Sequence, residues 1–461
     1  MTPLEARSSC RKGHPCGGLF VACLALAACG PSASVHPDIS ASPVPESDRL
    51  PNPLGVYEQL GHLVGDRRFA AVGKFAYLPG PADSTYAVLA LSLPNSALRF
   101  RREPPDFLAR YRVAVVVGDS AAPAAQLSEL EEVRVRTFRE TSRRDESVVF
   151  QALLTLVPGE YPAEIDVRDL GSSAGFSGAT DLRVPRFGPA SISAPIVVYR
   201  ARARPTRESP PSLILNPRAT IELSGAESRV HLETLSDSDS LAILEARQDG
   251  QVLWTDTLAL RPGEGRLRTA ATPLDPERLP PGAVSLHARL AGKMTGDSTT
   301  VVVALLPDWP FVSYAEAMSH LRYAGTPDEI EALSNVPPEE RAQQLHAFWK
   351  RKDPVPETSE NEFFEEYFRR LQEANDRFSD GVNAGWLTDR GAVYVTLGPP
   401  DGVRGSLDAR QGQERSQIWL YHKSLGFELR LVFVDQGGLG VLVLTAESRQ
   451  AFHEAARTIR S

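Results

Sequence analysis

The run Tyr111-Arg112-Val113-Ala114-Val115-Val116-Val117 decides the fold class of the first half of this 461-residue chain. Large apolar side chains occupy every second position of the run, which is typical of a β-strand with one face in a core. Runs with the same period lie on both sides, bounded by Gly, Pro, Asp and Ser. They are Tyr86–Leu91, Val133–Phe138, Val148–Leu154 and Ala163–Val167. Short strands at this spacing predict an antiparallel β-sandwich of immunoglobulin-like type over residues 54–205.

A second antiparallel sandwich of the same type is predicted over residues 209–306, after a proline-rich hinge from Arg204 to Pro211. Its alternating runs include Val230–Glu233 and Val284–Leu290. We expect both sandwiches to serve as spacers or binding modules.

Two details of these segments bear on packing and binding. Tyr161 follows the turn at Pro158-Gly159 and stands where such sandwiches often carry a corner tyrosine. Arg200, Arg202 and Arg204 alternate near a strand end, which favours a solvated strand face over an anion site.

The hydrophobic period then changes to about 3.6, and a helical segment is predicted over residues 307–384. Ser313 and Thr326 each begin a capping box with Glu three residues later. A third helix is predicted from about Pro338 to Trp349, and a fourth from Thr358 or Ser359 to about Ser379. The fourth helix is expected to bury one stripe of side chains: Phe364, Tyr367, Phe368, Leu371, Ala374 and Phe378.

An α+β domain that packs with the helical segment is predicted over residues 385–461. Its predicted strands are Ala392–Leu397, Ile418–Tyr421, Phe427–Val434 and Val441–Thr445, and its last helix is Ser448–Ile459.

The start of this domain resembles the signature of GWxTD-domain proteins. The residues that carry the resemblance are Gly385, Trp386, Thr388, Asp389, Arg390, Gly391, Gly398, Pro400 and Asp401, with Trp349 and Asp353 upstream. Lys352 and Val355 depart from the family's pattern, in which Arg and Thr are expected. The resemblance implies an exported protein in which β domains precede the motif, and it implies no reaction.

Three interpretations of the motif remain open. In the first, Trp386 is a core residue, Thr388 and Asp389 bond backbone amides before a strand, and Gly391 takes a positive φ. In the second, carboxylates converge in a cleft for glycoside hydrolysis or for a hard cation. Those carboxylates are Asp353, Glu362, Asp389 and Asp401, with Arg369 and Arg390 beside them. In the third, Arg390 and the neighbouring aromatic residues form a groove for a peptide or glycan.

The N-terminus predicts a lipid anchor. All four cysteines fall within the first 29 residues, and Leu26-Ala27-Ala28-Cys29 ends an apolar run that follows a positively charged stretch. This pattern resembles the bacterial lipobox, so residues 1–28 are predicted to be a signal peptide and Cys29 the acylated first residue. Residues 29–53 are predicted to be a flexible tether. Because Gly30 follows Cys29, the resemblance implies the outer membrane, facing the periplasm or the cell surface.

Composition and motif spacing limit the function. The net charge of −8 would become −10 without the leader, which excludes the electrostatic footprint of a nucleic-acid-binding protein. No zinc-type histidine pair and no G-x-S-x-G sequence occurs, so we expect no metal, no cofactor and no nucleophilic serine. The sequence therefore predicts a membrane-anchored binding or assembly module with an envelope protein or glycan partner. An envelope hydrolase and a purely structural motif are the alternatives.

Overall fold

The structure is a computed structural model of the chain. It describes residues 52–143, 147–189, 191–223, 227–237, 241–306, 309–358, 361–380, 383–405, 416–435, 438 and 440–460. The predicted signal peptide, Cys29 and the tether before Asn52 lie outside the described residues. The described residues belong to one compact unit, Pro45–Ser461. In the described part of the chain, no helix has both the length and the apolar character needed to cross a membrane.

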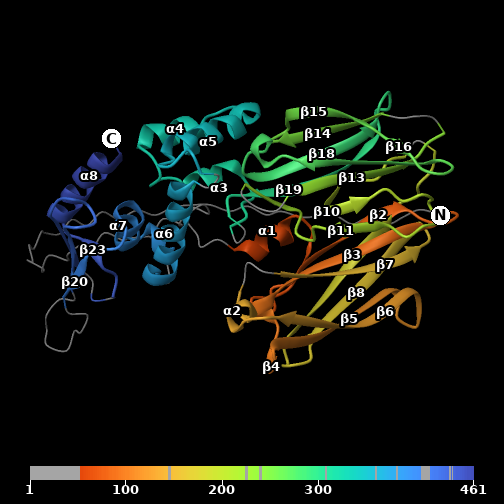
Figure 1. Ribbon diagram of the computed structural model, residues 1–461, viewed down its shortest axis with the longest axis horizontal. Coiled ribbons are helices and arrows are strands. Elements are labelled where there is room, and N and C mark those ends of the chain that lie inside the picture. Colours follow the sequence, from red (N-terminus) through yellow and green to blue (C-terminus); the bar gives the residue numbers. More distant parts are fainter. Residues whose placement is uncertain are drawn as a thin grey trace, which may run out of the picture. The chain divides into compact units, whose positions relative to one another are not determined.

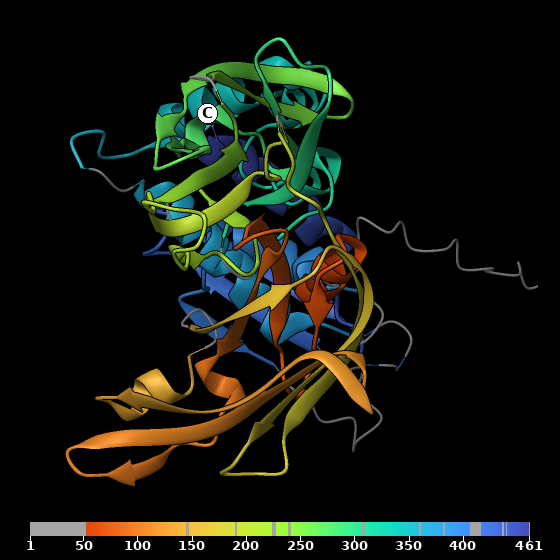
Figure 2. The ribbon, with the colours of Figure 1, turned by 90° about the vertical axis from the view of Figure 1, so that its right-hand side faces the viewer.

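Two sheets form the first β-rich part. Sheet 1 has the order β1-β2-β3-β7: β1 (Leu63–Val64), β2 (Val72–Pro79), β3 (Thr85–Pro94) and β7 (Ser147–Leu156). Sheet 2 has the order β4-β5-β8-β9: β4 (Arg101–Glu103), β5 (Asp106–Asp119), β8 (Gly159–Asp169) and β9 (Gly175–Val184), with β6 (Ala122–Val135) paired to β5. Figure 2 shows β5 and β6 as a long hairpin, in orange. Apolar side chains of β3 and β7 pack against those of β5 and β8 in one core.

Two further sheets form the second β-rich part. Sheet 3 has the order β11-β10-β13-β17-β16: β11 (Ser212–Leu215), β10 (Ile196–Arg202), β13 (Ser228–Leu235), β17 (Leu267–Leu274) and β16 (Arg261–Pro262). Sheet 4 has the order β12-β19-β18-β14-β15: β12 (Thr220–Glu222), β19 (Gly296–Ala304), β18 (Gly282–Leu290), β14 (Leu241–Gln248) and β15 (Gln251–Ala259). These sheets share a second core. Because β12 pairs with β19 in parallel, sheet 4 is mixed and not antiparallel as predicted.

Sheets 1 and 3 also face each other, so the four sheets are stacked in the order 2, 1, 3, 4 (Figure 1). Leu78 and Val88 of sheet 1 share a third apolar cluster with Ile196 and Leu215 of sheet 3. All ten residues of β3 are buried, because sheet 1 is covered on both faces. The two β-rich parts are therefore docked through a common core.

The predicted boundary at residues 205–209 falls inside sheet 3. Strand β10 was assigned to the first β segment, but it pairs with β11 and β13 of the second, with Ala201 opposite Leu213. The prolines after Arg204 do not end the sheet, since they belong to a loop that returns the chain to the same sheet edge.

The buried side chain of Arg204 stabilises this loop through hydrogen bonds. Its side chain is 2% exposed and donates from Nη2 to Glu233 Oε2 at 2.6 Å. Nη1 donates to the carbonyl oxygens of Arg207 and Ser209 at 2.6 and 2.9 Å, and Nη2 also donates to the carbonyl oxygen of Pro79 in sheet 1. The prediction of a solvated arginine face was therefore wrong for Arg204, because a buried carboxylate and several backbone carbonyls take the place of water.

Short helices and turns flank these sheets. They are α1 (Pro53–Gln59), α2 (Phe138–Thr141), η2 (Asn95–Ala97) and η3 (Pro276–Arg278). The hydroxyl of Tyr161 donates to the carbonyl oxygen of Val157 at 2.9 Å across the turn between β7 and β8.

The C-terminal third contains the predicted helices followed by a small sheet. The helices are α3 (Tyr314–Ser319), α4 (Pro327–Ser334), α5 (Pro338–Lys352) and α6 (Glu362–Phe378). The turn η4 (Gly385–Leu387) and α7 (Asp389–Leu397) follow. Sheet 5 has the order β20-β21-β22-β23: β20 (Gly402–Arg404), β21 (Ser416–Tyr421), β22 (Leu429–Val434) and β23 (Val443–Leu444), and α8 (Ala446–Arg460) ends the described chain.

The capping box predicted at Thr326 is confirmed, since Thr326 and Glu329 bond each other reciprocally. At Ser313 the hydroxyl accepts from the amide of Glu316, but the Glu316 carboxylate accepts from the amide of Val312 at 3.1 Å, so the cap is present without the reciprocal bond. Five of the six predicted stripe residues of α6 are buried: Tyr367, Phe368, Leu371, Ala374 and Phe378. The sixth, Phe364, is half-buried and packs against the same core.

The predicted strand Ala392–Leu397 is wrong, because this segment belongs to helix α7. Val393, Val395 and Leu397 alternate in the sequence as strand residues would, but Tyr394 between them is also buried. A short segment that is covered on several sides gives no reliable period.

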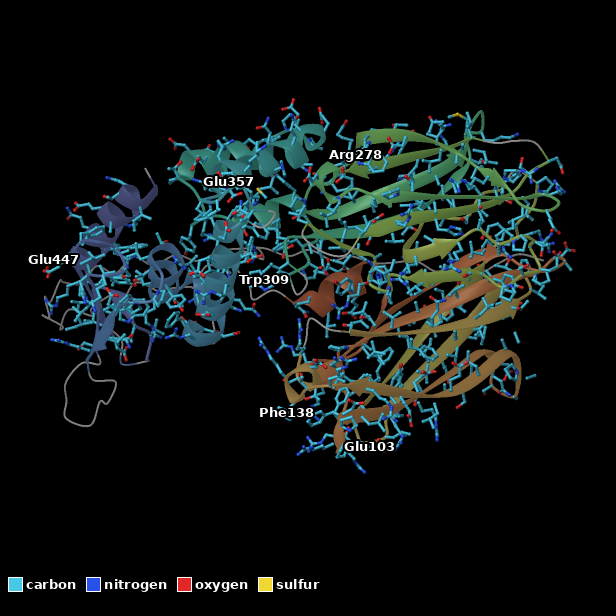
Figure 3. All side chains as sticks on the ribbon, in the orientation of Figure 1. Glu103, Phe138, Arg278, Trp309, Glu357 and Glu447 are labelled. Atoms are coloured by element: carbon cyan, nitrogen blue, oxygen red, sulfur yellow. The ribbon has the colours of Figure 1, made fainter. Side chains whose placement is uncertain are left out.

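The helices contact sheet 4 directly, with α5 beside β15 (Figure 1). Arg341 of α5 donates to the side chain of Gln248 at 2.7 Å, and its guanidinium lies 4.4 Å from the ring centroid of Tyr314. Trp309, labelled in Figure 3, enters the helical core with only 5% of its surface exposed.

Arg204→Met should lower the free energy of unfolding by about 3–5 kcal/mol, because it leaves the Glu233 carboxylate buried without its cation. Adding Glu233→Leu should restore part of this loss, since no unpaired charge then remains. Urea unfolding followed by circular dichroism measures both. Arg202→Met, at an exposed position two residues away, is the control and should unfold like the parent protein. Equal stability of Arg204→Met and the parent would contradict the assignment.

His62 should make the protein sensitive to acid. Burial, with help from the nearby Lys74 charge, lowers the pKa of His62 from 6.5 to about 3. Between these values the unfolded chain binds the proton and the folded chain does not, so the free energy of unfolding falls as the pH decreases. From pH 7 to pH 5, His62→Gln should lose about 2 kcal/mol less than the parent in urea titrations. His453→Gln, at an exposed histidine, should follow the parent curve.

Candidate functional site

Two glycines of the motif allow η4 and α7 to approach their neighbours closely. A β-carbon on Gly385 would lie 2.2 Å from the carbonyl oxygen of Ala374 in α6, and one on Gly391 would lie 1.9 Å from the carbonyl oxygen of Gly385. The Gly385 amide also donates to Asn375 Oδ1 at 3.0 Å. Gly391 lies in the first turn of α7 and not at a positive φ as predicted. Its role is to leave room for another backbone.

Trp386 is a core residue, as the structural interpretation predicted. Its side chain is fully buried, and its ring centroid lies 4.7 Å from that of His320. The guanidinium of Arg322 lies 4.9 Å from the same ring, and the Tyr323 hydroxyl donates to the Trp386 carbonyl oxygen at 3.1 Å. The helices upstream therefore close over the motif.

Thr388 and Asp389 connect α7 to its surroundings. The Thr388 hydroxyl caps α7 by accepting from the Gly391 amide at 3.1 Å. The Asp389 carboxylate accepts from the Leu444 amide at 2.6 Å and from both terminal nitrogens of Arg449. Asp389 thus joins the start of α7 to β23 and α8.

Asp401 organises a different turn. Its Oδ2 accepts from the amides of His422, Lys423 and Ser424 at 2.7, 2.9 and 3.3 Å. These bonds, led by the one from His422, lower the pKa of Asp401 from 3.8 to about 2. The Asp401 carboxylate is therefore ionised, and it accepts hydrogen bonds from three backbone amides.

Gly398 and Pro400 belong to the turn that precedes Asp401. Gly398 has a φ of +83°, and its carbonyl oxygen accepts from the Tyr421 hydroxyl at 3.0 Å. Pro400 is half-buried in the same turn. Helix α7, which ends at Leu397, leads directly into this turn.

The remaining predicted site residues are Arg390, Trp349 and Asp353. The guanidinium of Arg390 lies 5.1 Å from the ring centroid of Phe378, and burial lowers its pKa against the opposing effect of Asp380. Trp349 is enclosed by aromatic rings of α5 and α6. The Asp353 carboxylate accepts from the Val355 amide at 3.0 Å just after α5.

Each of the four candidate carboxylates accepts hydrogen bonds from different groups of the fold. Asp389 and Asp401 bond different backbone segments, Asp353 bonds its own turn, and Glu362 accepts from the Thr358 hydroxyl at 3.1 Å. Paired catalytic carboxylates need a shared pocket and, for the acid, a raised pKa. The pKa of Asp401 is shifted the other way.

A cavity beside the motif was missed by the sequence analysis. This motif cavity has a volume of about 460 Å³ and lies between α5, α6 and α7. It is lined by three cations and one carboxylate, Arg351, Lys352, Arg370 and Glu366, and by the aromatic residues Tyr323, Phe363 and Tyr367. Tyr323 joins the cavity to the motif through its bond to Trp386.

The three cations of the motif cavity differ in their ion pairs. Arg370 Nε donates to Glu366 at 2.6 Å, and the Arg370 guanidinium lies 3.1 Å from the β-carbon position of Gly398. Lys352 Nζ lies 3.2 Å from Glu329. Arg351 is exposed and makes no ion pair with the residues that the structure describes. The sequence contained a signal for this cavity. Arg351 and Lys352 end one helix, and Phe363 and Arg370, seven residues apart, lie on one face of the next helix.

Comparisons with known proteins identify a family only for the C-terminal region. The GWxTD domain family matches residues 290–439, from the end of β18 past β22. The match includes the helical segment and β19. A comparison with curated proteins found no match.

Red sea bream transglutaminase is a similar solved structure, at 8% identity and a TM-score of 0.17. The match covers 52% of this chain and 31% of that one, so the chain spans about a third of the transglutaminase. So low a score carries no argument about fold or activity.

Gly391→Ala should destabilise the C-terminal region by about 3 kcal/mol or more, because the new methyl group overlaps the Gly385 carbonyl oxygen. Tryptophan fluorescence during urea unfolding reports it, since Trp349, Trp386 and Trp419 lie in this core. Gly402→Ala is the matched control, because its β-carbon would have no atom nearer than 3.9 Å. Similar unfolding curves for the two variants would show that the close approach is not required.

Proposed function

We propose that this GWxTD domain-containing protein is an envelope-anchored lipoprotein that binds an envelope protein through the motif cavity of its C-terminal domain. The anchor is the acylated Cys29, held in the outer membrane, and the β sheets carry the domain away from the membrane surface. The observation that supports binding best is the cluster of cations and aromatic faces beside the motif.

The charge of the cavity favours an acidic partner segment. Three cations and one carboxylate line it, in a chain whose net charge is −8. Arg370 is paired with Glu366 and Lys352 with Glu329, so Arg351 is the cation that supplies unbalanced positive charge. Arg351 has no ion pair among the described residues and can receive a carboxylate from the partner. Tyr323 and Phe363 add apolar area, which a peptide side chain can cover.

The contacts of the motif support the same proposal. Asp389 bonds the Leu444 amide and Arg449, and Asp401 bonds the amide of His422, so the polar residues of the motif hold helices and turns together. The motif then serves to position α6 and α7, whose side chains form the binding surface. A motif that positions the helices, beside a separate surface that binds, favours a binding module over a hydrolase.

We also propose that the two β-rich parts are of immunoglobulin-like type. The bond from the Tyr161 hydroxyl to the Val157 carbonyl oxygen, four residues upstream, supports this assignment, because a corner tyrosine makes such a bond. In this view the stacked sheets act as a spacer or docking surface.

Arg351→Glu should abolish recovery of the partner, because it places a negative charge at the mouth of the cavity. The full lipidated protein is crosslinked in cell envelopes, purified by affinity and compared with the variant by mass spectrometry. We expect recovery of the partner to fall at least about tenfold, as for reversal of an interface charge. Lys350→Glu changes charge equally at an exposed neighbouring position outside the cavity and should keep the partner.

Equal recovery of the partner with both variants would contradict the role of the cavity. Recovery of crosslinked glycan and no protein would contradict the choice of partner. Circular dichroism of both variants confirms that they are folded before the comparison is made.

A further inference from the structure

A pocket beside helix α1, which we call the α1 pocket, lies where the described chain begins. Asn52, Pro53, Leu54 and Tyr57 line it, together with residues of sheet 1 and of α6. Figure 1 shows α1 between sheet 1 and α6. The pocket has a volume of about 510 Å³, within the usual range for sites of small organic ligands. No described residue lines both this pocket and the motif cavity, so the two are separate.

Helix α1 is packed on the sheets, which fixes the point where the preceding segment joins the described fold. The side chain of Tyr57 is 2% exposed and packs in one cluster with Val72 of sheet 1 and Val302 of sheet 4. Its hydroxyl forms a hydrogen bond with Thr220 Oγ1 at 2.7 Å. Asn52 immediately precedes α1, so the segment that leads back to the predicted anchor begins at the α1 pocket.

The lipid anchor of the proposed function would keep this pocket near a membrane. Asn52 follows Cys29 by 23 residues. For the flexible tether that the sequence predicts, this length corresponds to a root-mean-square span of about 25–30 Å. The surface around Asn52 therefore stays within a few nanometres of the lipid headgroups.

Three arginines reach the α1 pocket from one end of sheet 1. Arg67 and Arg68 lie in the connection that enters β2, and Arg218 donates from Nη2 to the Ser147 hydroxyl, at 3.3 Å, where β7 begins. Strand β3 lies between β2 and β7, and its last residues pair with the first residues of both. The usual strand spacing then puts the starts of β2 and β7 about 10 Å apart, so the arginines of both sides can contact one ligand.

The α1 pocket has a net positive charge. Its charged lining residues are Arg67, Arg68, Arg218 and Asp376. None of the three arginines forms an ion pair with a residue that the structure describes. Arg67 and Arg68 are exposed, and Arg218 is half-buried. Guanidinium groups in this state bind phosphate oxygens through paired N–H donors.

Other lining residues suit a ligand that is larger than phosphate. Leu54, Ala70 and Trp309 supply apolar surface. Ser96 and Gln372 are exposed and offer a hydroxyl and an amide to hydroxyl groups of a ligand. The headgroup of an anionic phospholipid such as phosphatidylglycerol has a phosphate, free hydroxyls and the apolar start of the acyl chains, which match these three kinds of contact.

We propose that the α1 pocket binds the headgroup of an anionic phospholipid in the membrane that holds the anchor. Arg67, Arg68 and Arg218 bind the phosphate oxygens, and Ser96 and Gln372 bind the headgroup hydroxyls. Electrostatic attraction to anionic lipid adds to the acyl anchor and sets which face of the protein lies against the membrane. The proposal rests on the anchor of the proposed function and not on its motif cavity.

Titration calorimetry of the full chain in an uncharged detergent tests this site. The probe is dihexanoyl phosphatidylglycerol. Dihexanoyl phosphatidylcholine has the same acyl chains without net charge, and inorganic phosphate represents a soluble source of the anion. We expect phosphatidylglycerol to bind at least about tenfold more tightly than either, and Arg67→Glu/Arg68→Glu to weaken its binding at least about tenfold, because two charged contacts are reversed.

Arg101→Glu/Arg102→Glu is the matched control, because it reverses two adjacent exposed arginines of β4 that do not line the pocket. It should bind like the parent protein. If the pocket variant does not fold, Arg67→Gln/Arg68→Gln removes the same charges without adding negative ones. Equal binding by the pocket and control variants would overturn the proposal, as would no binding of phosphatidylglycerol by the parent protein. Equally tight binding of phosphatidylcholine or inorganic phosphate would overturn the choice of an anionic lipid.

A separate measurement distinguishes failure of this site from failure of the anchor. The probes are soluble, so their binding does not require an acyl group on Cys29. Mass spectrometry of the intact chain from cell envelopes reports whether Cys29 is acylated. An acylated chain that does not bind phosphatidylglycerol would contradict the α1 pocket alone.

Discussion

The C-terminal domain depends on the contact between two backbones at Gly385 and Gly391. The carbonyl oxygen of Gly385 occupies the space that any side chain on Gly391 would need, so α7 begins directly against η4. This contact fixes Trp386 in the core and sets α7 beside α6. The cavity between these helices, with Arg370 against Gly398, follows from that placement. A motif that determines packing can therefore be essential to a binding site without touching a ligand.

The polar residues of the motif likewise determine packing. Asp389 and Asp401 have the chemistry of catalytic groups, but each accepts hydrogen bonds from backbone amides in its own part of the fold. The amide bonds to Asp401 lower the pKa of this carboxyl group, so it is ionised and oriented, which stabilises its turn and leaves little capacity to transfer a proton. The cations that remain accessible lie beside the motif, on α5 and α6. The geometry thus favours recognition of an anionic partner.

Arg200, Arg202 and Arg204 occupy alternate positions of the sequence, but their side chains have different surroundings in the structure. Arg204 lies where sheets 1 and 3 meet and bonds Glu233 and the carbonyl oxygen of Pro79, while Arg200 and Arg202 line a groove. Nothing local distinguishes the three, because the difference comes from contact with sheet 1, whose Pro79 lies 125 residues before Arg204. The buried Arg204 and the two-sided burial of β3 also explain why the β-rich parts share a core.

The sequence alone determined the features that depend on near neighbours. The caps at Ser313 and Thr326, the buried stripe of α6, the strands of the β-rich parts and the GWxTD signature were all readable, because each rests on residues a few positions apart. Tertiary structure decided whether residues 392–397 are helix or strand, since their burial on several sides removes the period. It also decided the partners of Asp389, Asp401 and Arg204, and the position of both cavities. These depend on contacts between distant segments, whose pairing no local pattern encodes.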